Sequence, residues 1–197
     1  MNWWLDRQKK DAFVKKRDQE QLRSRAAFKL IELIDKFKLK SAKGPFVDLG
    51  AAPGGWTEIL IKTYPGQRIV AVDLLPIKPL NGAVILQGDF TDSNCLTEID
   101  NALEQQKAGA IFSDMAPNFS GQPLIEQAKM FNITELLVSL SQNKLRKGGF
   151  IVQKVFHGSE FQSIIQAWKN IYKQVDVFKP ISSRAESSEV YLVIRNS

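Results

Sequence analysis

The sequence predicts an α/β fold, with a mostly parallel seven-stranded sheet, helices on both of its faces and an antiparallel last strand. Two patterns after Gly44 predict it: seven short apolar runs follow one another, and amphipathic segments lie between most of them. Such runs are typical of strands covered on both faces, and their alternation with helices is typical of a parallel sheet. At 197 residues the chain is long enough for one domain with a full hydrophobic core.

The predicted strands alternate with helices, except at two connections. Residues 75–83 contain two prolines and leave room only for a rudimentary helix. Residues 181–187 are too few for a helical crossover, so the last two strands should pair antiparallel. The seven runs are PFVDLG (45–50), RIVAVDL (68–74), AVILQGD (83–89), AIFSDMA (110–116), FIVQKVF (150–156), VDVFKP (175–180) and EVYLVI (189–194).

Helices are expected between these strands and before the first of them. Gly148-Gly149 follows a basic turn and is expected to stop the longest helix. Ahead of Gly44, residues 3–20 and 22–40 are predicted to be helical, the second with one apolar face. The candidates between strands are GGWTEILIKTY (54–64), CLTEIDNALEQQ (95–106), LIEQAKMFNITELLVSLSQNKL (124–145) and FQSIIQAWKNIY (161–172).

The positive charge is concentrated at the start of the chain. Residues 1–40 hold 12 basic and 6 acidic side chains, whereas the remainder is neutral and the whole chain has a net charge of +6. We therefore divide the chain into a basic helical arm (1–40), part of the same domain, and a catalytic domain (41–197). The arm suggests a polyanionic partner, which is nucleic acid or an anionic membrane surface, although a solvated basic face is the simpler alternative.

Cysteine and histidine usage excludes several classes of protein. Cys95 is the only cysteine and His157 the only histidine, so disulfide scaffolds, zinc sites and Ser-His-Asp arrangements are disfavoured, and no metal is expected. The chain has neither an apolar stretch of about 20 residues nor a signal-peptide pattern. A cytoplasmic protein is therefore expected.

The turn after the first strand is the predicted cofactor site, because α/β sheets bind ligands at the carboxyl ends of their strands. Residues 48–56 (DLGAAPGGW) are glycine-rich but lack the G-x-G-x-x-G dinucleotide pattern, which disfavours a nicotinamide-dependent oxidoreductase. Asp73 ends the next strand, where it could accept from ribose hydroxyls, and Asp89 and Phe90 end the third, where they could contact adenine.

Three carboxylates around a nucleoside pocket favour a cationic ligand without phosphates, and S-adenosyl-L-methionine has this chemistry. Each Asp alone could equally be a turn residue that ends a strand; three at successive strand ends favour a ligand. The residues expected to contact this cofactor are Asp48, Gly50, Pro53, Gly54, Gly55, Trp56, Asp73, Asp89, Phe90 and Asp114.

Seven segments together resemble the RrmJ/FtsJ family of ribosomal RNA 2′-O-methyltransferases. They are LRSRAAFKL, VDLGAAPGGWTE, VDLLPIKP, LQGDF, FSDMAPNFSG, VQKVF and SSRAESSEVYLV, which run from about Leu22 to Ile194 in the order of the family. The resemblance implies a Rossmann-like S-adenosylmethionine-dependent methyltransferase. His157 is a departure, since close relatives have glutamine there, and we interpret it as a loop residue.

The resemblance also implies a catalytic tetrad of Lys29, Asp114, Lys154 and Glu189. The residues alone already single out Lys154, because it interrupts an apolar strand and lysine is rarely buried without a partner. Our hypothesis is that Lys154 takes the proton of the ribose hydroxyl and that Asp114 orients it. Lys29 and Glu189 would hold the ribose and the lysine in place.

The substrate implied by the resemblance is a uridine in the A-loop of large-subunit (23S) ribosomal RNA, methylated in the 50S subunit or its precursor late in assembly. We expect a monomer that binds RNA phosphates through the arm and through Arg184, and no membrane partner. Two alternatives stay open: a tRNA 2′-O-methyltransferase, and a non-catalytic RNA-binding assembly factor with the same fold. The arm residues expected to bind RNA are Lys9, Lys10, Lys15, Lys16, Arg17, Arg23 and Arg25.

Overall fold

The computed structural model describes residues 22–197, apart from 119 and 185. The helix predicted for residues 3–20 lies outside this part of the chain. The same holds for the arm residues Lys9, Lys10, Lys15, Lys16 and Arg17.

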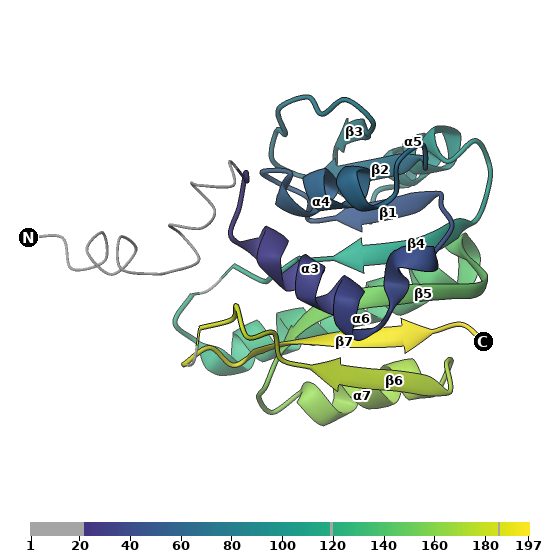
Figure 1. The fold of residues 1–197 in the computed structure, drawn as a ribbon. Coiled ribbons are helices and arrows are strands. Elements are labelled where there is room, and N and C mark those ends of the chain that lie inside the picture. Colours follow the sequence, from purple (N-terminus) through teal and green to yellow (C-terminus); the bar gives the residue numbers. More distant parts are fainter. Residues whose placement is uncertain (1–21, 119, 185) are drawn as a thin grey trace, which may run out of the picture.

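Seven strands form one sheet in the order β3-β2-β1-β4-β5-β7-β6 (Figure 1). Strand β1 pairs in parallel with β2 and β4, and β7 is inserted antiparallel between β5 and β6. The predicted antiparallel pairing of the last two strands is therefore confirmed. The strands are β1 (Phe46–Leu49), β2 (Ile69–Asp73), β3 (Val84–Gln87), β4 (Ala108–Ser113), β5 (Leu145–Phe156), β6 (Gln174–Phe178) and β7 (Glu189–Arg195).

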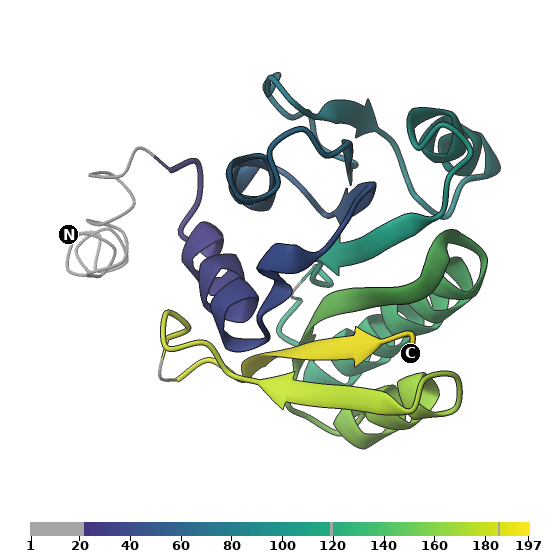
Figure 2. The same cartoon turned by 45° about the vertical axis from the view of Figure 1, so that its right-hand side comes forward.

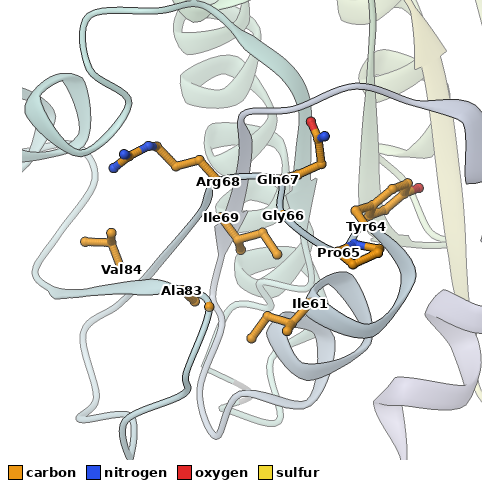
Figure 3. Close-up of a pocket in the computed structure, with 10 residues that line it drawn as sticks. Ile61, Tyr64, Pro65, Gly66, Gln67, Arg68, Ile69, Ala83 and Val84 are labelled. Carbon is orange, nitrogen blue, oxygen red and sulfur yellow. The ribbon is translucent and has the colours of Figure 1, made fainter.

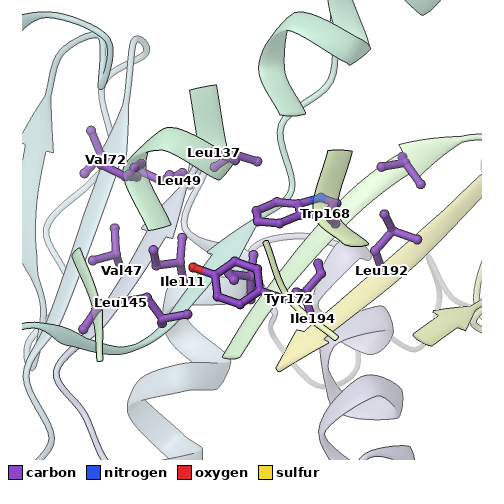
Figure 4. Packing of buried hydrophobic residues seen from close by; sticks show 14 of the residues in the cluster. Val47, Leu49, Val72, Ile111, Leu137, Leu145, Trp168, Tyr172, Leu192 and Ile194 are labelled. Atoms are coloured by element: carbon purple, nitrogen blue, oxygen red, sulfur yellow. The ribbon is translucent and has the colours of Figure 1, made fainter. Parts of the chain in front are cut away.

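Helices cover both faces of this sheet (Figures 1 and 2). One face packs against α3 and α4 and the other against α5, α6 and α7, which gives two hydrophobic cores. Figure 4 shows the second core, in which Trp168 and Tyr172 lie beside aliphatic residues of the central strands. The helices are α3 (Ala26–Lys36), the 3₁₀ helix η1 (Leu39–Ser41), α4 (Gly55–Thr63), α5 (Ser93–Ala102), α6 (Pro123–Lys144) and α7 (Phe161–Lys169).

Local signals explain where these helices form. In α3 the apolar residues recur at helical spacing, and Ala27, Leu30 and Ile34 are buried against the sheet. Helix α5 begins after Asp92, whose side chain accepts a hydrogen bond from the backbone amide of Asn94. As expected from its prolines, the connection between β2 and β3 contains no helix. Within the described residues, none of the helices is both long and apolar enough to cross a membrane.

The predicted helix stop at Gly148-Gly149 is wrong. Helix α6 ends at Lys144, and both glycines lie inside β5, beside a register irregularity in its pairing with β4. Gly148 has a φ of +75°, and a Cβ on Gly149 would lie 2.9 Å from the carbonyl oxygens of Gly109 and Arg146. The glycines are therefore required by close backbone approach within a strand, not by a helix end.

The expectation that every strand is covered on both faces also needs correction. The central strands β1 and β4 are fully buried, but β3 and β6 lie at the edges and are only half-buried. In β6, Val177 is 46% exposed. An apolar run predicts a strand but does not reveal its place in the sheet.

Candidate functional site

The site lies at the carboxyl edge of the parallel strands, which is the left side of the sheet in Figure 1. The strand order reverses its direction of growth between β1 and β4, which is the switch point where α/β sheets bind ligands. Because β7 runs antiparallel, its first residue, Glu189, lies at the same edge. The topology thus brings the glycine-rich loop, the end of β4, the end of β5 and the start of β7 to one edge.

Two glycines allow the loop after β1 to approach its neighbours. Gly50 has a φ of +71°, and a Cβ there would lie 2.5 Å from Cγ of Met115 in the loop after β4. Gly54 has a φ of +104° and immediately precedes α4. A larger residue at position 50 would push the loop away from the end of β4, so Gly50 lets the segments after β1 and β4 lie close together.

Arg23 fastens this loop from outside. Its guanidinium donates hydrogen bonds to the carbonyl oxygens of Lys78 (2.9 Å) and Pro79 (3.0 Å), and more weakly to that of Pro53 (3.4 Å). These bonds join the segment before α3 to the loops after β1 and β2. The Arg23 guanidinium therefore has a structural role between these loops, besides the contact with RNA phosphates that was predicted for it.

Asp73 combines a structural contact with remaining capacity for a ligand. Its two carboxylate oxygens accept hydrogen bonds of 2.8 Å from the backbone amides of Ala52 and Leu75. Each oxygen keeps a further lone pair, and the residue is only half-buried. Asp73 thus shapes the glycine-rich loop and can still accept from hydroxyl groups.

Asp48 is buried beneath the same loop. Its Oδ2 accepts a hydrogen bond of 2.6 Å from the hydroxyl of Thr57, and Oδ1 has no partner among the described residues. Burial, opposed by the bond from Thr57, raises the pKa of Asp48 to about 7. Asp48 is therefore a buried carboxyl that is bonded to the first turn of α4.

The remaining predicted cofactor residues differ in how far they are exposed. Asp89 is exposed, and its Oδ1 accepts hydrogen bonds from the amide and hydroxyl of Thr91. These bonds are typical of a turn residue that ends a strand, which was the alternative to a ligand contact. The ring of Phe90 is half-buried and packs against the core beneath α5 and α6. Trp56 is buried and donates from Nε1 to the carbonyl of Ala26 (2.8 Å), so its indole joins α4 to α3.

The residues at this edge of the sheet fit the predicted cofactor. Asp73 offers acceptors to ribose hydroxyls, Asp89 lies exposed at the next strand end, and Arg23 donates to backbone carbonyls beside the loop. Carboxylates at two successive strand ends suit a ligand with hydroxyls and a positive charge, and they disfavour phosphates.

Lys154 and Asp114 form the first half of the predicted tetrad. Asp114 directly follows β4, and its Oδ1 lies 3.2 Å from Nζ of Lys154. The same ammonium group donates to the backbone carbonyl of Asp114. Both side chains are largely buried, with 11% of Lys154 and 17% of Asp114 exposed. Lys154 is therefore held by two contacts to one residue.

Lys29 and Glu189 form the second half. Nζ of Lys29 lies 2.6 Å from Oε1 and 2.8 Å from Oε2 of Glu189, although the residues are 160 positions apart in sequence. The hydroxyl of Ser183 also donates to Oε1 of Glu189 (3.0 Å). The structure thus brings all four predicted residues to the edge of one sheet face, as two ion pairs.

Tyr191 links the two pairs and was not predicted. It pairs with Lys154 across β5 and β7, its hydroxyl donates to Oδ1 of Asp114 (2.8 Å), and its ring lies 6.0 Å from Nζ of Lys29. Burial, and then the carboxylates of Asp114 and Glu189, raise the pKa of Tyr191. Strand alternation places it on the same face as Glu189, which was the available signal; in an apolar strand it looked like a core residue.

A basic cavity of about 250 Å³ opens beside Lys29 and Glu189. Arg25, Arg184 and Ser187 complete its lining. The loop between β6 and β7 that carries Arg184 is anchored to α3, because Glu32 accepts from the amides of Ile181 and Ser182. Of the cations predicted to bind RNA, Arg25 and Arg184 are thus placed next to the tetrad.

A cavity at the opposite edge of the sheet has none of these features. It has a volume of about 640 Å³ and lies between the end of α4 and the starts of β2 and β3, next to Tyr64 and Val84 (Figure 3). Its charged residue, Arg68, forms an ion pair with Glu104. A large cavity without a cluster of reactive groups does not make a catalytic site.

Comparison with known proteins agrees with this geometry. The family model described as FtsJ-like methyltransferase matches residues 22–197. A ribosomal RNA large subunit methyltransferase E from Thiobacillus denitrificans is 42% identical, over 98% of this chain and 88% of that protein. The protein of the same name from Bordetella petrii is 39% identical, over 98% of this chain and 94% of that protein.

A solved structure shows the same fold. A ribosomal RNA methyltransferase from Plasmodium falciparum has a TM-score of 0.78 at 23% identity, over 88% of this chain and 97% of that one. The predicted Rossmann-like architecture is confirmed, and the family match covers the part of the chain that holds the glycine-rich loop and both ion pairs. The chain belongs to the FtsJ-like methyltransferase family.

Proposed function

We propose that the protein transfers a methyl group from S-adenosylmethionine to a ribose 2′-hydroxyl of large-subunit ribosomal RNA. The observation that carries the proposal is the convergence of Lys154–Asp114 and Lys29–Glu189 at the sheet edge that also holds the glycine-rich loop. The names of the relatives, which are ribosomal RNA large subunit methyltransferases, support the substrate class. The finer target is a uridine of the A-loop, modified late in the assembly of the 50S subunit.

The cofactor would be held at the carboxyl ends of β1, β2 and β4. Gly50–Gly54 would supply backbone contacts, Asp73 would accept from the ribose hydroxyls, and Asp89 would lie near the base. When bound, S-adenosylmethionine supplies the methyl group. Asp48 would act from below, by holding the first turn of α4 through Thr57.

Lys154 is the proposed base for the ribose hydroxyl. A neutral amine has two N–H groups and one lone pair, and Asp114 offers two acceptors to it, the backbone carbonyl and Oδ1. With both N–H groups directed at Asp114, the lone pair is left to accept the proton of the hydroxyl. Asp114 therefore sets the direction in which Lys154 acts.

Lys29 and Glu189 would position the ribose. Glu189 can accept from a ribose hydroxyl while Lys29 and Ser183 hold its carboxylate in place. Lys29 also places a positive charge near the region in which the hydroxyl oxygen becomes more negative as its proton leaves. Alignment of this kind is the main requirement of an in-line methyl transfer.

RNA would be held mainly through its phosphates. Arg25 and Arg184, at the basic cavity next to the tetrad, are placed to contact the backbone of the target nucleotide. The arm residues between 9 and 17 would add contacts farther away. We expect a monomer that acts in the cytoplasm, where the subunits are assembled.

Incubation with methyl-labelled S-adenosylmethionine tests the proposal. We expect the label in large-subunit ribosomal RNA from cells that lack this methylation, presented as naked RNA and as subunits. Mapping of 2′-O-methylation should place it on one uridine of the A-loop. Label in tRNA alone would support the tRNA methyltransferase instead, and no label in any RNA would support a non-catalytic assembly factor.

A further inference from the structure

A second cavity, of about 310 Å³, opens at the same edge of the sheet as the tetrad. It lies between the first turn of α6 and the loop that follows β5, and Leu124, Gln127, His157, Ser159 and Ser188 contribute to its lining. Its volume is at the lower end of the range for small-ligand sites. None of its residues belongs to the tetrad or to the predicted cofactor site.

The cavity is adjacent to the reacting groups. His157 is three residues beyond Lys154, which is about 10 Å along a strand. The amide of His157 donates a hydrogen bond of 2.9 Å to the carbonyl of Ser188, next to Glu189. His157 and Ser188, which adjoin the paired ends of β5 and β7, thus connect the strands of Lys154 and Glu189 to the cavity.

The two cavities beside the tetrad differ in charge. The one on the α3 side contains Arg25, Lys29 and Arg184 with a single carboxylate, so it suits a phosphate group. The one on the α6 side is neutral apart from Glu126, whose carboxylate accepts from the amides of Ser120 and Gly121 and so serves the loop. A nucleobase is neutral and flat with a polar edge, and it matches the second cavity.

Gln127 gives the neutral cavity a specific polar group. Its Oε1 is buried and accepts no hydrogen bond from the described residues. The carboxamide is packed against Gly158, since a Cβ at that position would lie 2.5 Å from Oε1. A buried acceptor without a donor is costly, and a ligand N–H group would satisfy it.

His157 forms an exposed wall of the cavity. Its ring lies against that of Phe161, with centroids 4.2 Å apart, and so has a fixed place in the loop. An exposed imidazole braced in this way offers a flat surface and a hydrogen-bonding edge.

We propose that this cavity receives the base of the nucleotide whose ribose is methylated, with Gln127 as the residue that recognises it. The inference rests on the proposed function and extends it to specificity. Uracil presents an N–H group beside a carbonyl oxygen, and a carboxamide can pair with both, accepting through Oε1 and donating through Nε2. Cytosine presents the opposite pattern at the same positions.

A double-mutant cycle between protein and RNA tests this assignment. Large subunits are reconstituted with ribosomal RNA that carries either the normal target uridine or an abasic ribose at that position. Single-turnover methylation is then measured for the unmodified protein, Gln127→Ala and a control, Gln162→Ala, which changes an exposed glutamine on α7. Ser159→Trp, at an exposed position, is a second variant that fills the cavity.

We expect the unmodified protein and Gln162→Ala to methylate the abasic RNA at least tenfold more slowly than the normal RNA. Gln127→Ala and Ser159→Trp should be slowed about tenfold on normal RNA and show little further loss on abasic RNA. Full additivity of the two losses, or normal rates in both variants, would overturn the assignment. Failure of the unmodified protein to methylate normal subunits would instead contradict the proposed function.

Discussion

The hydroxyl of Tyr191 donates a hydrogen bond of 2.8 Å to Oδ1 of Asp114, the same oxygen that lies 3.2 Å from Nζ of Lys154. One carboxylate oxygen therefore joins the end of β4 to both β5 and β7. Because Tyr191 is fully buried, its hydroxyl fixes where this oxygen lies and hence the position of Lys154. The raised pKa of Tyr191 keeps it a hydrogen-bond donor throughout the neutral range.

Tyr191→Phe should lower kcat about tenfold, because loss of a hydrogen bond to a charged group costs about 1.5–3 kcal/mol. The dissociation constant of S-adenosylmethionine should stay unchanged, since Tyr191 lies on the tetrad side of the site. Single-turnover kinetics and calorimetric titration of the cofactor check the two parts. An unchanged kcat would show that Asp114 does not need this bond for its position.

The ion pair of Lys29 and Glu189 should reveal itself in stability as well as in activity. Lys29→Met and Glu189→Gln each leave a largely buried charge or dipole without its partner, so each should lower the free energy of unfolding by about 3 kcal/mol. The double variant should lose much less than the sum, while all three variants lose methylation. Urea unfolding measures these energies, and strictly additive losses would contradict the pairing.

Arg23 should affect the cofactor and not the RNA. Arg23→Lys removes the planar fork that donates to Lys78 and Pro79, so it should weaken S-adenosylmethionine binding several-fold despite keeping the charge. Arg23→Gln, which also removes the charge, should leave the salt dependence of RNA binding unchanged, whereas Arg184→Ala should reduce its slope. A reduced slope in Arg23→Gln together with normal cofactor affinity in Arg23→Lys would show that Arg23 contacts RNA phosphates instead.

Asp48 should make stability depend on pH. Its pKa is about 7 in the folded protein against an ordinary value of 3.8, so the unfolded chain loses this proton first as the pH rises. Stability from this group is therefore fully present below about pH 4, falls between about pH 4 and 7, and is level above that. Unfolding in urea from pH 4 to 9 measures this effect. The free energy of unfolding of Asp48→Asn should rise relative to that of the unmodified protein between about pH 4 and 7. A constant difference would contradict the raised pKa.

The sequence was sufficient, for physical reasons, to predict the strands and to single out Lys154. Buried parallel strands need continuous apolar runs, so Lys154 stood out as a charge inside one of them. The motif resemblance supplied its partners, and the structure places Asp114 and Glu189 within reach. A charged residue inside an otherwise apolar strand can therefore be recognised from a single sequence.

Other features depend on contacts that no local pattern encodes. Gly148-Gly149 looked like a helix end because glycines are common there, but their neighbours are Gly109 and Arg146 on adjacent backbone. The bonds of Arg23 to the loop after β2 could not be read from the basic arm, because its acceptors there, the carbonyls of Lys78 and Pro79, are more than 50 residues away. Nothing in the sequence was a reason to select Gln127, because its proposed role depends on the cavity that it lines together with the loop after β5.

The central claim is that Lys154 takes the proton of the ribose hydroxyl. Single-turnover methylation of large-subunit ribosomal RNA at saturating S-adenosylmethionine tests it most directly, with Lys154→Ala compared with Lys169→Ala, an exposed lysine on α7. We predict a loss of about 100- to 10,000-fold for Lys154→Ala, as for removal of a general base, and a normal rate for the control. A near-normal rate for Lys154→Ala would contradict it.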